Sequence, residues 1–292
     1  MSARRVVITG MGAVTGFGFE WQSMWMQMLN GAHCIRPWQP EEITDGSFPV
    51  RYAAAVDMGL LPAYLQEHPA WRLPLEKRSR YGWVAATQAF SDSGLQAEQL
   101  RDAAVLCVSG APQHMLADMQ LALADEAHAG ADWRHLMQRA AEVQVQGSLR
   151  QSNDRLAQVI ADDLGCEGPV INISSACAGA AQAIGNAFQM IRRGEVEIAL
   201  AGGADSVLNL DTMGALYLLG AASSEQRWGK DLCRPFDRDR SGLVAGEGGG
   251  FIVLETLERA LARGAKPYAE IIGFGSSLDA YKVTAPDPQG RG

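Results

Sequence analysis

The chain has 292 residues, 47% of them hydrophobic, which is enough to bury a large core in one α/β domain or in two smaller ones. Its 33 acidic residues outnumber 25 basic ones, and the net charge of −8 argues against general binding to nucleic acid or to an anionic membrane surface. Five cysteines without a C-x-x-C pair predict neither a disulfide framework nor a metal site, so we expect a cytoplasmic protein. No stretch approaches the ~20 apolar residues of a membrane span.

Short β-branched runs alternate with longer helical patterns, which predicts an α/β fold with crossover helices over a mostly parallel sheet. The clearest unit is a strand–helix–strand crossover in which Gly194 ends the helix. In chain order, strands are expected at residues 6–9, 103–109, 170–174, 197–201, 251–255 and 269–274, and helices at residues 21–29, 78–91, 178–193 and 257–263. Residues 111–165 lack β-branched runs, and we interpret them as a helical insertion.

Residues 10–16 (GMGAVTG) follow the first expected strand and raise the question of a dinucleotide site. The spacing is G-x-G-x-x-x-G, and no acidic residue follows a second strand at the distance that a ribose partner needs. We therefore expect a tight strand-to-helix turn here instead of a bound nucleotide.

Cys177 stands between an expected strand end and the first turn of an expected helix. Unpaired backbone N–H groups and the helix dipole favour an anion there, so a thiolate at this position can act as a nucleophile. The small residues at 174–179 (SSACAG) leave room for a substrate carbonyl, and the Cys177 N–H could help to hold an oxyanion. The alternative is a buried structural cysteine, as we expect for Cys107 in the middle of a strand.

The chain resembles the β-ketoacyl-acyl carrier protein synthases in a series of motifs that occur in the family's order. These are VVITGMGAVT at 6–15, SSAC at 174–177, AGGA at 201–204, RPFD at 234–237, RSG at 240–242, GEG at 246–248 and TLERALARGA at 256–265. The likeness continues to residue 281, and the segment at 111–165 is the clearest departure from the family pattern.

The resemblance implies a thiolase-like fold, layered α/β/α, built of two similar halves. Residues 1–262 are then the first half with the nucleophile, and residues 263–292 begin the second. The implied enzyme is an acyltransferase of fatty-acid or polyketide-type synthesis. Cys177 takes an acyl group from a carrier protein, and malonyl-carrier protein then loses carbon dioxide and attacks the thioester in a decarboxylative Claisen condensation. The substrates are carried on the phosphopantetheine of the carrier protein, and no cofactor of the enzyme itself is implied.

Further site residues follow from the same resemblance. Thr212 and Leu216 are expected to line the acyl pocket and Thr284 to lie near the pantetheine path, although Leu216 is equally compatible with ordinary core packing. An acyl carrier protein is acidic, so the basic cluster Lys77, Arg78 and Arg80 is a candidate docking site.

The family usually forms dimers through the strand before the nucleophile, here residues 170–174. The implied partner subunit is identical or a similar ketosynthase-like chain. Glu247, in a glycine-rich turn, is expected to be a structural hydrogen-bonding group and not an acid.

The family's decarboxylation step uses two histidines and a lysine from the second half. His33, His68, His114, His128 and His135 match neither histidine setting, so we assign them no catalytic role. We therefore expect a truncated chain that is incomplete for full turnover, with a split enzyme as the alternative. Within the fold, the competing function is a non-condensing chain-length partner of a polyketide-type synthase. Outside that class, a non-catalytic scaffold with a buried Cys177 is the alternative.

Overall fold

The computed structural model describes residues 4–73, 75–110, 152–282 and 285–292. The strands are β1 (Val6–Val14), β2 (Arg36–Pro37), β3 (Tyr52–Ala53), β4 (Ala104–Ser109), β5 (Val170–Ile173), β6 (Ile198–Ser206), β7 (Glu247–Thr256) and β8 (Ala269–Ile271). The α-helices are α1 (Trp21–Leu29), α2 (Ala63–Glu67), α3 (Lys77–Ser93), α6 (Arg155–Leu164), α7 (Gly179–Arg193), α8 (Leu210–Leu218) and α9 (Leu257–Ala262). Short 3-10 turns are η1 (Met58–Leu60), η2 (Pro69–Arg72), η3 (Ala97–Leu100), η5 (Ala176–Ala178) and η6 (Gly229–Asp231). Among the described helices, we find none with the length and apolar character that crossing a membrane requires.

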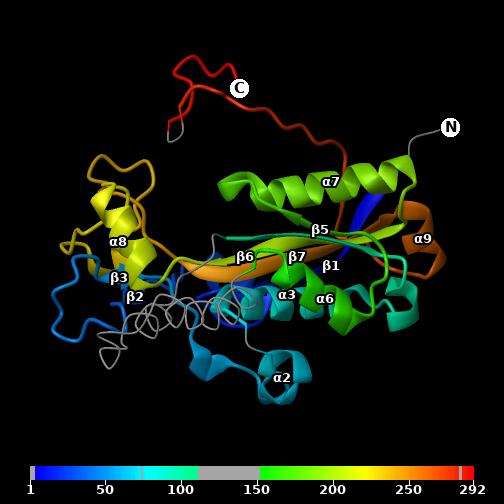
Figure 1. The fold of residues 1–292 in the computed structure, drawn as a ribbon, viewed down its shortest axis with the longest axis horizontal. Helices are drawn as coiled ribbons and strands as arrows, with labels where there is room; N and C mark the ends of the chain where they lie inside the picture. The colour runs from blue at the N-terminus through cyan, green and yellow to red at the C-terminus, as the bar shows by residue number, and fades with distance from the viewer. Residues whose placement is uncertain (1–3, 74, 111–151, 283–284) are drawn as a thin grey trace, which may run out of the picture.

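A six-stranded sheet in the order β5-β4-β6-β7-β1-β8 forms the middle layer (Figure 1). β4 pairs in parallel with β5 and with β6, whereas β7 runs antiparallel to both β6 and β1, and β8 runs antiparallel to β1. It follows that β1, β4, β5 and β6 point the same way. The α/β class predicted from the alternating pattern is thereby confirmed, with a mixed sheet.

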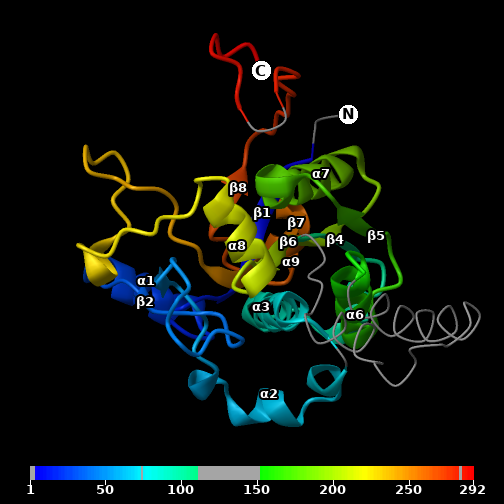
Figure 2. The same ribbon diagram turned by 60° about the vertical axis from the view of Figure 1, so that its left-hand side comes forward.

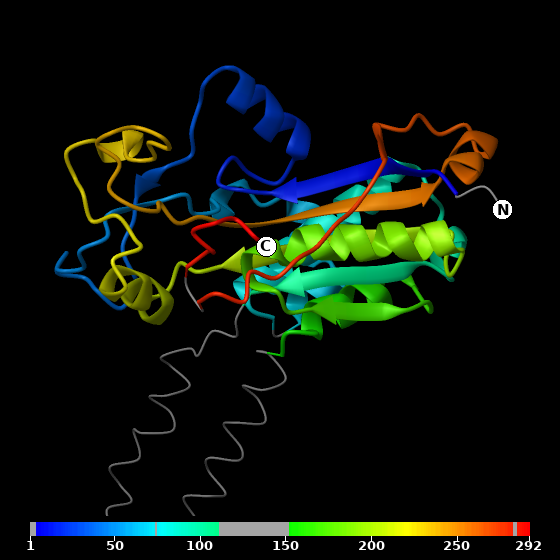
Figure 3. The same cartoon turned by 90° about the horizontal axis from the view of Figure 1, so that it is seen from above.

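Helices cover both faces of this sheet. α7 lies along the strands on one face, and α3 with α6 lies on the other (Figures 2 and 3). Under α3 and α6 the core includes Trp83, Leu156 and Ile160, all fully buried. Under α7 it includes Phe188 and Ile191. α7 forms where its apolar residues recur at helical spacing, and it ends at Gly194, whose φ of 77° is the left-handed conformation that glycine tolerates.

The glycine-rich segment after residue 9 is part of β1 and does not form the tight turn that we predicted. β1 continues to Val14 because α3 packs directly on this strand: a methyl group at Gly10 would collide with the carbonyl oxygen of Ala89, and one at Gly12 with that of Ala85. These glycines therefore allow a close approach of helix and strand. The turn comes later, between Thr15 and Gly18, whose backbones exchange two hydrogen bonds of 2.9 Å.

The segment expected as an insertion ends in a core helix. Residues 155–164 form α6, which lies between β4 and β5 in the chain and packs its buried face against α3 and β4. Residues 111–151 lie outside the described residues. β8, expected to open a second half, pairs with the edge of the first sheet at β1, and the division at residues 262 and 263 stays a prediction.

Candidate active site

Cys177 lies in the short turn η5, between the end of β5 at Ile173 and the start of α7 at Gly179. The residue before it, Ala176, has a φ of 41°, in the left-handed region that residues with a side chain rarely adopt. Strain of this kind costs about 1–3 kcal/mol and clusters at functional sites. Here it directs the chain from the strand into the helix and leaves the Cys177 side chain exposed.

The surroundings of this turn suit a nucleophilic thiolate. α7 has 15 residues, so its N-terminus carries the partial positive charge of a full helix. The N–H groups of Ala178 and Gly179 donate to the Ser175 and Ala176 carbonyls. The turn follows β5, and β5, β4 and β6 are parallel, so their carboxyl ends meet at one edge of the sheet. Ligands of α/β proteins bind at this edge, outside the carboxyl ends of parallel strands.

Burial separates the five cysteines into two groups. Burial raises the pKa of Cys107 to about 12 and that of Cys166 to about 11, and it also raises the pKa of Cys34. These three side chains are thiols at neutral pH. Cys177 and Cys233 are the two exposed cysteines. The expectation of an inert Cys107 is consistent with its position in the core.

The expected acyl-pocket residues lie on α8, which follows β6 and so starts from the same sheet edge as Cys177. Thr212 is half-buried, and its backbone N–H donates to the Asn209 side chain that caps α8 (2.8 Å). Leu216 is also half-buried and packs against a small separate core around Met213. The structure thus accounts for Leu216 by packing, and its role in an acyl pocket stays a prediction. Thr284 lies outside the described residues.

The basic cluster at the start of α3 does not present three cations to a partner. Arg78 is fully buried, and its Nε donates to the Glu76 carboxylate at 2.5 Å, so we remove Arg78 from the docking surface. A guanidinium inside the protein requires such a charged partner. Lys77 is exposed, with its Nζ 3.8 Å from Glu41, and Arg80 is half-buried with its guanidinium over the ring of Trp71.

Glu247 of β7 is hydrogen-bonded to α3, to β6 and to the loop that follows β3. One carboxylate oxygen accepts from the Val56 N–H (3.0 Å) and from the Tyr81 hydroxyl (3.2 Å), and the other accepts from the Ser206 hydroxyl (2.6 Å). Burial is the main reason that the pKa of Tyr81 is raised, with the charge of Glu247 adding to the effect. Glu247 is therefore the structural hydrogen-bonding group that its sequence position predicted.

The two described histidines make local contacts. His33 Nε2 lies 3.4 Å from the Asp231 carboxylate, and His68 Nδ1 accepts from the Ala70 N–H at 3.3 Å. The His68 ring also lies beside Trp83, with ring centres 4.9 Å apart. His114, His128 and His135 lie outside the described residues.

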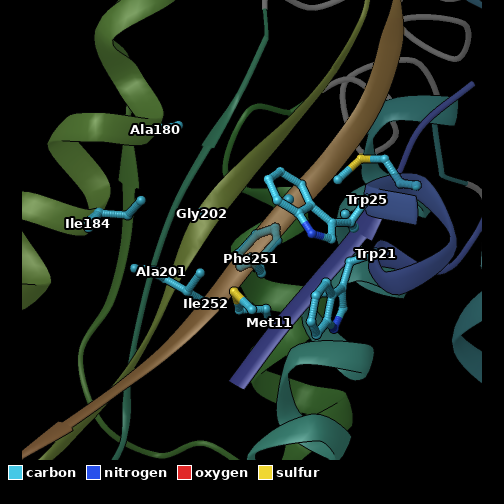
Figure 4. Close-up of a pocket in the computed structure, with 13 residues that line it drawn as sticks. Met11, Trp21, Trp25, Ala180, Ile184, Ala201, Gly202, Phe251 and Ile252 are labelled. Carbon is cyan, nitrogen blue, oxygen red and sulfur yellow. The ribbon is translucent and has the colours of Figure 1, made fainter. Parts of the chain in front are cut away.

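An apolar cavity of about 470 Å³ lies between α1 and α7 over β1, β6 and β7 (Figure 4). Ala180 and Ile184 of α7 line one side, and Trp21 and Trp25 of α1 line the other. Ala180 is in the first turn of α7, three residues after Cys177. This cavity was not predicted from the sequence, although Trp21, Met24 and Trp25 recur at the spacing of one helical face.

The chain matches a known protein family over most of its length. Residues 3–260 match the family described as "Beta-ketoacyl synthase, N-terminal domain". The chain belongs to the β-ketoacyl synthase family. This agrees with the motifs around Cys177 and at residues 234–248, and with the exposed cysteine at the start of α7.

Relatives within the β-ketoacyl synthases cover the whole chain. It is 32% identical to the 3-oxoacyl-[acyl-carrier-protein] synthase 2 of Vibrio cholerae, over 100% of this chain and 67% of that protein. It is also 32% identical to the nodulation protein E of a Rhizobium species, over 98% of this chain and 66% of that protein. The chain thus spans about two thirds of the length of these relatives.

Solved ketosynthase structures share the fold. A β-ketoacyl synthase from Burkholderia phymatum superposes with a TM-score of 0.79 at 30% identity, covering 98% of this chain and 67% of that one. A ketosynthase in complex with a type II polyketide synthase acyl carrier protein has a TM-score of 0.76 at 25% identity, covering 96% and 65%. The thiolase-like fold inferred from the motifs is confirmed.

Proposed function

We propose that this chain is a β-ketoacyl-acyl carrier protein synthase in which Cys177 accepts the acyl group. The observation that carries the proposal is the exposed thiol on a strained turn at the N-terminus of a 15-residue helix, at the carboxyl edge of parallel strands. The family membership and the names of the relatives support the same reaction.

In the first half-reaction, the Cys177 thiolate attacks the carbonyl carbon of an acyl thioester held on a carrier protein. The new C–S bond forms as the carbonyl π electrons move to oxygen, and N–H groups at the start of α7 can stabilise the oxyanion. Collapse of this tetrahedral species expels the carrier's thiolate, which takes up a proton, and leaves the acyl group on Cys177. In the second half-reaction, malonyl-carrier protein loses carbon dioxide, and the electron pair left on its α-carbon attacks the carbonyl carbon of the Cys177 thioester. The C–S bond to Cys177 then breaks, which releases the β-ketoacyl-carrier protein and restores the Cys177 thiolate. We assign neither His33 nor His68 to this decarboxylation.

The proposal implies partners and a compartment as well. We propose an acyl carrier protein as the substrate carrier, so the chain needs no cofactor of its own, and Lys77 with Arg80 stays the candidate docking pair. The five cysteines are free, which is typical of a reducing compartment and supports a cytoplasmic location.

Incubation with an acyl-acyl carrier protein, followed by intact mass and peptide mapping, tests the function. We expect one acyl adduct, on Cys177. With iodoacetamide we expect fast modification of Cys177 and slow modification of the exposed Cys233. Cys107 should stay unmodified even when the pH is raised from about 7 to 9, because its pKa is about 12 and the thiolate is the reactive form. Alkylation of Cys177 without any acyl adduct would favour the non-condensing partner subunit.

We also propose a dimer through β5, formed with an identical or a similar subunit. β5 is an edge strand of the sheet, and its Val170 and Ile171 side chains are 41% and 38% exposed. An apolar, β-branched edge strand is suited to pairing with a second strand.

Ile171→Lys is expected to shift the chain from dimer to monomer in sedimentation, because a charge at a paired edge opposes association. Leu261→Lys, on the exposed part of α9 (60% exposed), is the matched control and should leave the dimer intact. Equal behaviour of the two variants would rule out β5 as the contact.

A further inference from the structure

We infer that Val108, at the end of β4, is the residue that positions Cys177. The inference rests on the proposed role of Cys177 as nucleophile. Val108 lies under the first turn of α7, and its isopropyl group fits against two glycines. A methyl group at Gly179 would lie 2.5 Å from Cγ2 of Val108, and a methyl group at Gly203 of β6 would collide with Cγ1. Both neighbouring positions thus lack a side chain where Val108 approaches.

The rest of α7 meets the sheet through small side chains at every fourth residue. Gly179, Ala183 and Ala187 are buried on the face that lies over β4 and β6. On the sheet side, Leu106 and Val108 of β4 point toward α7, and Cys107 between them points to the opposite face, because successive strand residues point to opposite sides. At the N-terminal end of α7, the Val108 side chain therefore faces Gly179, which has no side chain.

This contact sets the position of the thiol. Cys177 precedes Gly179 by two residues. It lies in the turn η5, which begins at Ala176 with a φ of 41° and leads directly into α7. Only Ala178 separates Cys177 in η5 from Gly179, so moving Gly179 away from the sheet moves Cys177 as well. A displacement of about 1 Å at a reacting group can cost as much as ~100-fold in rate. Val108 is accordingly a positioning residue that acts through Gly179.

The test adds a methyl group on the α7 side of this contact and then removes side-chain atoms on the β4 side. The measured quantity is the rate at which iodoacetamide modifies Cys177, with Cys233 of the same molecule as the internal reference. Gly179→Ala is expected to slow Cys177 about tenfold relative to Cys233, because its new methyl group must push the turn away from Val108, which changes how the Cys177 thiolate faces the positive N-terminus of α7. The Gly179→Ala/Val108→Ala double variant removes both Cγ atoms. Its Cys177 rate is expected to return to within about threefold of the parent, a coupling that independent sites do not have.

Gly214→Ala on α8 is the matched control, because a methyl group there meets nothing within 4 Å. It should leave the rate ratio unchanged. A merely structural role for Val108 would lower the melting temperature of Gly179→Ala without changing the Cys177 to Cys233 ratio, and that result would overturn the inference. So would a folded double variant that reacts no faster than Gly179→Ala.

If Gly179→Ala does not fold, Val108→Ala alone decides the matter. It removes the support under the turn and is expected to slow Cys177 about threefold or more, and an unchanged rate in the folded variant would contradict the inference. The parent chain separates this result from the proposed function. If parental Cys177 shows no preference over Cys233, the nucleophile assignment fails and the positioning role falls with it. If the preference is present but insensitive to both substitutions, only the role of Val108 is wrong.

Discussion

Cys177→Ala is expected to lower acyl transfer from an acyl-acyl carrier protein by about 1,000-fold or more, because removing a nucleophile removes the covalent step itself. The fold should be unaffected. The Cys177 side chain is exposed, and substitutions at such positions change the free energy of unfolding by about 0.5 kcal/mol or less. The measurement is acyl transfer to the protein, followed by intact mass, with thermal unfolding of the same sample.

Cys233→Ala is the matched control for this substitution, since Cys233 is the other exposed cysteine. It should transfer acyl groups at the parental rate. Acyl transfer that survives in Cys177→Ala and is lost in Cys233→Ala would mean that the wrong exposed thiol has been assigned. Transfer that survives in both variants would point to a nucleophile other than an exposed cysteine.

Glu255→Ala is expected to lower the free energy of unfolding by about 3–5 kcal/mol, the cost of breaking a buried ion pair by removing one partner. The Glu255 side chain is fully buried in β7. Its carboxylate accepts from the Thr9 hydroxyl at 2.5 Å and from the guanidinium of Arg263, whose Nε lies 3.1 Å from Oε2. Arg259 Nε lies 3.8 Å from the same oxygen. Loss of this carboxylate removes the partner of the mostly buried Arg263 guanidinium, whereas Arg259 keeps its contact with Glu197 (3.3 Å).

Denaturant unfolding followed by circular dichroism measures this change. Glu258→Ala, which changes an exposed glutamate on α9, should have a free energy of unfolding within about 0.5 kcal/mol of the parent. Thr9→Val should lower the free energy of unfolding by about 1.5–3 kcal/mol, which is between the effects of the two glutamate variants, because it removes one hydrogen bond to a charged group. Similar unfolding curves for Glu255→Ala and Glu258→Ala would mean that the buried carboxylate does not stabilise the join between α9 and the sheet.

The local sequence pattern was sufficient to predict the elements whose apolar residues are buried in the core. β4, expected at 103–109, forms at Ala104–Ser109, and α7, expected at 178–193, forms at Gly179–Arg193. β4 was predicted from a continuous apolar run, and α7 from apolar residues at helical spacing with Gly194 at its end. These local signals need no knowledge of neighbours.

Elements that depend on a neighbour were predicted less well. The glycines of β1 were interpreted as a turn. Sequence alone cannot distinguish a glycine that forms a turn from a strand glycine that lets a helix pack closely on the strand. Arg78 was placed on the surface for a similar reason: sequence alone cannot say that an arginine lies inside with Glu76. Whether a polar or flexible residue is buried is decided by the element that packs on it.

The sequence by itself predicted Cys177 as the nucleophile and indicated the family. Cys177 was assigned because small residues, a strand end and a helix start surround it within a few positions, and because the motifs follow the family's order. Only the tertiary structure decided that Ala176 enters the turn at a positive φ and that Val108 lies beneath Gly179. Residues 108 and 179 are far apart in the chain, and a contact between them exists only once β4 and α7 are packed together. Local chemistry can therefore be inferred from adjacent residues, whereas the position of the reacting atom depends on the packing of separate elements.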